Sequence, residues 1–290
     1  MRDEVRHPVW RWLIFGHVWV AAAVAAQILQ TSLWLHEGSL ARRYAMAGFL
    51  GSFAAYGVTR LARIAGPEAE EYINLRWYER NRKLMHVLVG MAGAAAFVLM
   101  WPLWPRIWKV MLPAVVLTFF YVTPFTSAKG LGIGLRSVPF LKALLIAVIW
   151  SVVAVAVPLQ MDPVGFPPFT VIGLTCMRVP LILALAILFD IRDQPTDDPA
   201  LRTVPLVFGV KGAKAIALVL LLCSAAFEVV FLRNLGHIAA SWTVLAGYAF
   251  AAILTVRARP ERDPFYYGIL VDGVMIAIPA CIGLGVLLGG

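Results

Sequence analysis

Residues 189–209 read FDIRDQPTDDPALRTVPLVFG and separate two long apolar runs. Within them, Asp190, Asp193 and Asp197 follow one another at intervals of three and four residues. Because a helix turns by about 100° per residue, a continuous helix would place these carboxylates within about 60° on one face. Carboxylates at the end of a membrane helix are costly unless water, cations or partners surround them. Clustered carboxylate oxygens, together with phosphate oxygens, suit Mg²⁺. The segment therefore predicts a divalent cation, a phosphorylated ligand and a membrane boundary.

Prolines divide this segment. Pro195 is unfavourable inside a helix, so we expect the preceding helix to end near Asp193. Asp198 followed by Pro199 is typical of an N-cap with a first-turn proline and favours a short second helix. A further break at 203–205 precedes the next apolar run.

Composition indicates a polytopic membrane protein. The 290 residues are 61% hydrophobic and 14% charged, with a mean hydropathy of +0.82. Soluble domains average about 45–50% apolar and about 25% charged residues. We predict an all-α bundle of nine transmembrane helices in a single domain, residues 1–290. The expected spans are 10–34, 44–61, 84–101, 107–122, 140–158, 169–189, 213–231, 238–256 and 265–288.

The net charge of +9 is distributed in a way that argues against nucleic-acid binding. When the connections are assigned alternately to two sides, 18 of the 25 Lys and Arg residues fall on the side of the N-terminus, and five fall on the other. Basic residues concentrate on the cytoplasmic side of membrane proteins. We therefore expect a cytoplasmic N-terminus and acidic segment, and a C-terminus on the opposite side.

A second long loop, residues 62–83, lies on the same predicted side as the acidic segment. From Glu68 to Lys83 it could form an amphipathic interfacial helix that turns Tyr72, Leu75 and Trp77 toward lipid or the bundle. A solvated connector with salt-bridged charges is the alternative.

The acidic segment and the pattern of spans resemble the UbiA superfamily of intramembrane aromatic prenyltransferases. The second signature of that family is roughly D-x-x-D-x-x-x-D, followed by a basic residue, Thr, any residue, Pro, and a Gly four residues later. Here the acidic positions are followed by Arg202, Thr203, Pro205 and Gly209. The interval between the third Asp and Thr is one residue shorter than expected, and the usual loop Gly is absent. The run PFLKALLIAVIW, residues 139–150, extends the resemblance.

The first signature of the family, N-D-x-x-D-x-x-x-D at the inner end of the second span, is missing. The corresponding residues 54–64 read AAYGVTRLARI, and no carboxylate occurs between Glu37 and Glu68. Arg60 and Arg63 stand three residues apart in its place. Guanidinium groups bind phosphate well, so these arginines could replace part of the missing metal site. They could also lie at the membrane boundary, or pair with the aspartates.

The resemblance implies a prenyltransferase that moves a polyprenyl group from its diphosphate to a hydrophobic, aromatic acceptor with Mg²⁺. Asp190, Asp193 and Asp197 would bind the metal. For Asp190 and Asp193, structural pairing with Arg192, Arg202 or Arg60 is the alternative. The expected diphosphate-binding residues are basic and predicted to lie on the inner side: Arg60, Arg63, Lys129, Arg136, Lys142 and Arg202.

Two other functions compete with transfer. Loss of the first signature favours a catalytically degenerate protein of the same fold that binds an isoprenoid lipid or supports a partner complex. A secondary transporter could instead use Arg178, Glu228 and Asp272, which lie within apolar runs, as an ion path. We expect Arg178 to pair with Glu228 or with a substrate headgroup.

Overall fold

The computed structural model describes residues 7–33, 38–64, 73–122, 125–126, 132–133, 140–162, 165–197 and 201–289. The α-helices are α1 (Pro8–Ile14), α2 (Val18–Ser32), α3 (Gly38–Arg63), α4 (Ile73–Arg80), α5 (Arg82–Met100), α6 (Trp104–Val122), α7 (Leu141–Ser151), α8 (Val157–Met161), α9 (Pro168–Asp193), α10 (Val204–Asn234), α11 (Ile238–Arg257) and α12 (Asp272–Gly289). Shorter elements are the 3₁₀ turn η2 (Trp101–Leu103), the π-helical segments η4 (Val152–Ala156) and η6 (Tyr266–Val271), and the strands β1 (Phe125–Thr126) and β2 (Gly132–Ile133).

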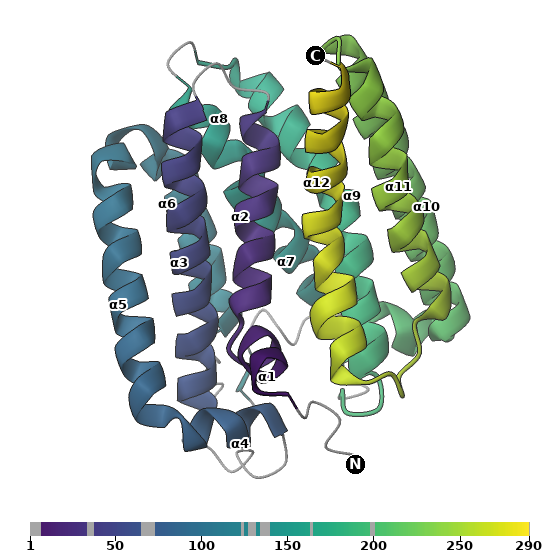
Figure 1. Ribbon diagram of the computed structural model, residues 1–290. Helices are drawn as coiled ribbons and strands as arrows, with labels where there is room; N and C mark the ends of the chain where they lie inside the picture. The colour runs from purple at the N-terminus through teal and green to yellow at the C-terminus, as the bar shows by residue number, and fades with distance from the viewer. Residues whose placement is uncertain are drawn as a thin grey trace.

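The long helices stand side by side in one bundle, and α4 crosses its lower end in Figure 1. The beginning of α1 and the end of α12 lie at opposite ends of the bundle (Figure 1). Helices satisfy their own backbone hydrogen bonds, as a bilayer requires. Large apolar side chains are exposed along the long helices, such as Leu222 at 70% and Phe97 at 63%. These features confirm the predicted all-α membrane architecture. The two strands form only a two-residue antiparallel pair, with Phe125 opposite Ile133.

The predicted count of nine spans is not confirmed and stays a prediction. By length and composition, six helical segments among the described residues could cross a membrane, or seven if the α1–α2 pair, bent by 54°, forms one span. One reason for the difference is α3, whose four arginines lower its hydropathy. The other is the continuous segment Arg82–Thr118, which counts as one span of 37 residues.

That continuous segment is a helical hairpin. At about 1.5 Å per residue, a single straight helix of its length would far exceed a bilayer core of about 30 Å. Nε of Arg43, near the start of α3, donates to the carbonyl of Leu99 at the end of α5. At the start of α6, Arg106 donates to the carbonyl of Met161 at the end of α8. From there α6 packs back along η4 and α7, so α5 and α6 run in opposite directions.

Two of the four packing units of buried apolar residues in the described structure lie on either side of α2. The larger unit joins α9, α10, α11 and α12, and includes Leu188, Leu221 and Ile278. The second unit joins α3, α4 and α5, and includes Phe53, Tyr78 and Met85. The helix between them is α2, which packs against both α3 and α12.

The loop at 62–83 contains the predicted amphipathic helix, described as α4. Leu75 and Tyr78 are fully buried against the second packing unit, and Trp77 is half-buried. The apolar face of α4 therefore packs on the bundle, which argues against the solvated-connector alternative for residues 73–80. Tyr72 and the acidic residues 68–71 lie outside the described part of this loop.

Candidate functional site

The last turns of α9 carry the acidic motif. The helix ends at Asp193, as Pro195 predicts. The backbone N–H groups of Thr196 and Asp197 then donate to the carbonyl of Asp193, at 2.9 and 2.8 Å. The bond from Asp197 continues the helical hydrogen-bond pattern for one more turn, which keeps its side chain close to those of the other two aspartates. Asp198 and Pro199 lie outside the described residues.

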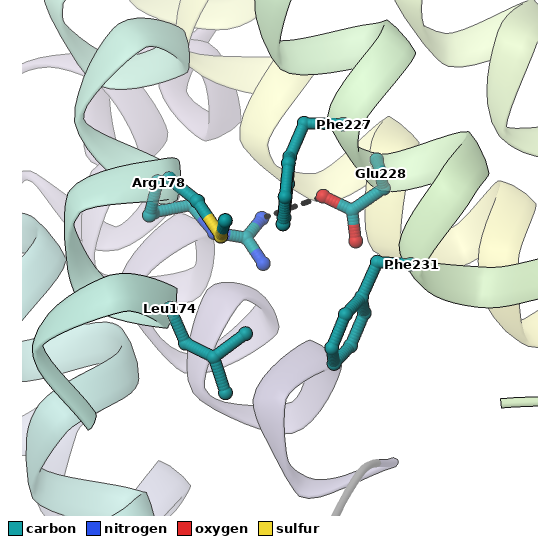
Figure 2. A pocket seen from close by; sticks show the side chains of 6 residues that line it. Leu174, Arg178, Phe227, Glu228 and Phe231 are labelled. Atoms are coloured by element: carbon teal, nitrogen blue, oxygen red, sulfur yellow. Dashed lines mark ion pairs between the residues drawn. The ribbon is translucent and has the colours of Figure 1, made fainter. Parts of the chain in front are cut away.

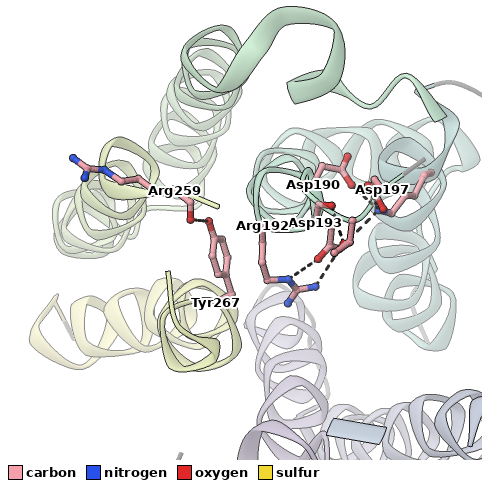
Figure 3. A network of polar contacts seen from close by, with 8 residues as sticks. Asp190, Arg192, Asp193, Asp197, Arg259 and Tyr267 are labelled. Carbon is pink, nitrogen blue, oxygen red and sulfur yellow. Dashed lines mark hydrogen bonds and ion pairs between the residues drawn. The ribbon is translucent and has the colours of Figure 1, made fainter. Parts of the chain in front are cut away.

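Lys142, in the first turn of α7, joins the three aspartates, which lie close together in Figure 3. Its Nζ lies 2.9 Å from Oδ1 of Asp190, 3.3 Å from Oδ2 of Asp197 and 3.9 Å from Oδ2 of Asp193. The Asp190 side chain is only 4% exposed, and that of Lys142 is 11% exposed. We call Asp190, Asp193 and Asp197 the acidic cluster. Sequence reasoning placed Lys142 at a diphosphate; the structure places it among these carboxylates.

Arg192 holds Asp193 from the other side. Its Nε and a terminal nitrogen donate to the two carboxylate oxygens of Asp193, at 2.7 and 3.2 Å (Figure 3). The guanidinium lies 4.9 Å from the ring centre of Phe189 and 5.8 Å from that of Tyr267. Tyr267 is held in turn by its hydroxyl, which donates to the carbonyl of Arg259 at 2.9 Å. The predicted alternative that Arg192 pairs with the cluster is therefore confirmed for Asp193.

The end of α3 lies at the same end of the bundle. Nε of Arg60 donates to Nε2 of His17 at 3.3 Å, and the His17 ring stacks on Tyr56. Arg60 is half-buried, and it is close enough to Arg63 and Arg192 for their positive charges to repel its guanidinium. Tyr78 of α4 is close by, and burial raises the pKa of its phenol to about 12. Arg60 therefore turns toward the bundle, where its guanidinium donates to a histidine.

The remaining predicted basic residues are dispersed. Lys129 and Arg136 lie outside the described residues. The side chain of Arg63 is half-buried at the last residue of α3. Arg202 is exposed just before α10, with a φ of 42°. Of the six predicted diphosphate-binding residues, Lys142 is the one that directly contacts the acidic cluster in the described structure.

The carboxylates have the right chemistry for Mg²⁺, but their arrangement suits an ammonium group. All three converge on Lys142. No group of three or more His, Cys, Asp or Glu side chains within the described residues is arranged to hold a metal ion. As arranged here, the residues of the cluster do not fit a metal ion.

The glycine that follows the acidic motif, Gly209, has a structural role in α10. It lies within α10 but has φ 68° and ψ 168°, and it kinks the helix one turn after Pro205. Only glycine readily adopts this region of backbone conformation. Thr203 is the N-cap residue of α10, and its buried hydroxyl has no hydrogen-bond partner among the described residues. The final residues of the motif therefore shape the start of α10.

A second polar cluster lies deeper in the bundle, between α2, α9 and α10. Arg178 donates to Oε1 of Gln27 at 3.0 Å and to Oε1 of Gln30 at 2.7 Å. It also pairs with Glu228 at 3.8 Å, as expected from the sequence. Gln30 donates to Glu228 at 2.8 Å. The sequence analysis missed both glutamines; the only signal was two amides three residues apart in an apolar run.

A small pocket adjoins this second cluster. Figure 2 shows Arg178 and Glu228 facing each other beside it. Its apolar lining is Leu174, Met177, Phe227 and Phe231.

Comparison with solved structures identifies the architecture. The chain is an integral, multi-pass membrane protein with an all-helical bundle. Its fold is UbiA-like: the apo structure of a UbiA homolog from Aeropyrum pernix K1 superposes with a TM-score of 0.61 at 15% sequence identity, covering 94% of this chain and 97% of that chain. No protein-family model and no curated protein matches the sequence. The fold predicted from the acidic motif is therefore confirmed.

Proposed function

We propose that this protein is a membrane prenyltransferase, which transfers a polyprenyl group from its diphosphate to a hydrophobic, aromatic acceptor. The observation that supports this function is the convergence of Asp190, Asp193 and Asp197 with Lys142 and Arg192 at one end of a UbiA-like bundle. The site is charged, partly buried and bordered by apolar helices. The apolar helices suit an isoprenoid tail, and in this proposal the basic residues of the site compensate part of the charge of a diphosphate head.

In the proposed reaction, the allylic carbon–oxygen bond breaks and the diphosphate leaves with the bonding electron pair. An electron-rich acceptor ring then attacks the allylic cation and loses a proton. Preorganised positive charge near the leaving group is the main way to stabilise such a transition state. Among the described residues, Lys142, Arg192 and Arg60 are cations that lie in or near this site. The requirement for Mg²⁺ stays a prediction.

The proposal is tested with purified protein in lipid nanodiscs. Farnesyl diphosphate is added with a panel of phenolic and quinone-precursor acceptors, and released pyrophosphate is measured. We expect acceptor-dependent release that Asp190→Asn reduces strongly. Lys214→Met is the matched control, because this lysine donates to the carbonyl of Val256 and not to a carboxylate. Release that is independent of acceptor, or unaffected by Asp190→Asn, argues against transfer at this site.

A second candidate is a catalytically degenerate protein that binds an isoprenoid lipid. Two observations favour it: Asp190 and Asp193 are already ion-paired, and residues 38–67 contain no carboxylate. This alternative predicts saturable binding of farnesyl diphosphate without pyrophosphate release across the acceptor panel. Binding is followed by isothermal titration calorimetry on the same samples.

The orientation in the membrane is also proposed. The side rich in Lys and Arg would face the cytoplasm, which places the acidic cluster where a soluble diphosphate is supplied. The acceptor and the isoprenoid tail would enter from the lipid between the helices.

A further inference from the structure

The pocket beside the second polar cluster combines two buried charges with an apolar rim. Arg178 and Glu228 line it, and they are only 3% and 6% exposed. The other lining residues are half-buried apolar side chains of α9 and α10: Leu174, Met177, Phe227 and Phe231. Because these four are partly exposed, the pocket lies near the surface of the bundle between α9 and α10, and its charged groups lie on the inner side.

The two charged groups of the pocket are too far apart for a direct hydrogen bond. Nη1 of Arg178 and Oε2 of Glu228 are 3.8 Å apart, whereas an N–H···O bond spans about 2.7–3.2 Å. The other oxygen of Glu228 accepts from Gln30 at 2.8 Å. One further oxygen atom can lie within about 2.8 Å of both charged groups and bridge them. The pocket has a volume of about 10 Å³, which is close to the space that one water molecule needs.

The charges around the pocket select the chemistry of a bridging group. Arg178 and Glu228 neutralise each other, and Gln27 and Gln30, which complete the cluster, carry no charge. A charged head group would add an uncompensated charge among buried residues, which is costly. A hydroxyl is neutral, and it can accept from the guanidinium while it donates to the carboxylate. An ether oxygen can only accept, and a hydrocarbon can do neither.

We propose that the pocket between α9 and α10 binds one neutral hydroxyl group, held between Arg178 and Glu228. A membrane-borne alcohol would place its chain against the stacked rings of Phe227 and Phe231, and a water molecule would fill the space alone. Arg178 lies twelve residues before Asp190 on α9, which is about 18 Å along the helix axis. The hydroxyl site is therefore separate from the acidic cluster, and it does not depend on the proposed transfer reaction.

The first test uses photoreactive probes of equal chain length that end in a hydroxyl, a methyl ether or a carboxylate. Each probe carries a diazirine next to its head group and is added to the wild-type protein in lipid nanodiscs, and the labelled residues are quantified by mass spectrometry. A hydrogen bond to a charged group changes affinity by about tenfold or more. At equal, subsaturating concentration, we therefore expect the alcohol to label residues 174–178 and 227–231 at least about tenfold more than the ether. The carboxylate should label them no more than the ether does.

Met177→Trp tests whether this labelling arises in the pocket. The larger side chain fills the pocket and removes neither charge, so labelling by the alcohol should fall to the level of the ether. Ile172→Trp is the matched control, because Ile172 lies on the same helix, is 63% exposed and does not line the pocket. It should be labelled as the wild type is. Labelling that Met177→Trp leaves unchanged would place the alcohol outside this pocket.

Cryo-electron microscopy of the wild-type protein in nanodiscs, with a bound antibody fragment and no added probe, does not depend on the folding of a variant. We expect an ordered oxygen within about 3.2 Å of both Arg178 and Glu228. Density that continues into a chain identifies an alcohol as its source, and isolated density identifies water. If no density lies between the two groups, and labelling by the alcohol is absent or insensitive to Met177→Trp, the proposal is overturned.

Discussion

The ammonium of Lys142 lies 2.9 Å from Oδ1 of Asp190, which joins the first turn of α7 to the last turn of α9. Both side chains are almost completely buried. The contact therefore has a structural consequence in addition to its place in the proposed site. Removing one partner of a buried pair leaves the other charge poorly compensated, which is far more costly than loss of an exposed pair.

Asp190→Asn should destabilise the protein more than Asp193→Asn. We expect the first change to lower the free energy of unfolding by about 2–3 kcal/mol, somewhat less than an isolated buried pair would lose, because Asp197 still faces Lys142. Asp193→Asn should cost under about 1 kcal/mol, because Asp193 is 30% exposed and its partner Arg192 is 40% exposed. Denaturant unfolding in detergent micelles measures both. Equal losses would contradict the ranking.

Arg60 is expected to contribute directly to diphosphate affinity. A charge-assisted contact to phosphate is worth about 1.5–3 kcal/mol, so Arg60→Ala should weaken farnesyl diphosphate binding by about one to two decades. Arg60→Lys should retain only part of the affinity, since an ammonium is a point charge and lacks the forked geometry of a guanidinium. Calorimetric titration measures the affinity. Arg82→Ala is the control, because that side chain is 58% exposed in an ion pair with Glu79. Wild-type affinity in Arg60→Ala would favour a membrane-boundary role.

Gly209→Ala should cost about 1–3 kcal/mol of unfolding free energy, because its backbone region is essentially restricted to glycine. The cost is purely conformational, since an added Cβ would meet nothing within 4 Å. Gly283→Ala is a matched control: its surroundings are equally open and its φ is not positive. In a helix that change should be neutral or stabilising. Thermal unfolding of both variants tests the difference, and similar melting temperatures would contradict it.

The pair of Arg178 and Glu228 should be strongly coupled. Arg178→Met leaves a buried carboxylate and should cost about 3–5 kcal/mol. Adding Glu228→Gln to that variant should recover part of the loss, because it removes the uncompensated charge. A double-mutant cycle by denaturant unfolding gives the coupling energy, with the exposed Arg233→Met as the control. Additive effects would show that the two charges act separately, as an ion path would allow.

Topology provides a further check on the site. Reporter fusions after residues 70, 200 and 260 should all report a cytoplasmic location, because the basic residues concentrate on that side. A fusion after residue 235, in the turn between α10 and α11, should report the opposite side. A signal from the opposite side for the fusion at 200 would remove the acidic cluster from the compartment that supplies soluble diphosphates.

Much of the fold could be predicted because it depends on local properties of the sequence. Apolar runs long enough to cross a bilayer predicted a helical membrane bundle, and Pro195 predicted the end of α9 at Asp193. The spacing of the acidic motif predicted that three carboxylates gather on one side. The number of spans is harder to establish, because the arginines of α3 reduce its hydropathy and only a 3₁₀ turn separates α5 from α6.

The partners of the site depend on how distant helices rotate against each other, which spacing within one helix does not determine. Lys142 was expected to hold a ligand, yet in the structure it contacts the carboxylates. Gln27 and Gln30 were missed because an amide in an apolar run gives no pattern until Arg178 is placed opposite it. The prediction of a metal site assumed that the carboxylates have no cationic partner in the protein. In the structure, Lys142 of α7 contacts all three of them.

The two packing units have a mechanical consequence. The acidic cluster extends from the unit of α9 to α12, whereas Arg60 and Tyr78 belong to helices of the other unit, and α2 lies between them. A ligand that contacted both Arg60 and the acidic cluster would connect the two units directly. We therefore expect such a ligand to raise the cooperativity of unfolding of the whole bundle, in addition to the connection that α2 already provides.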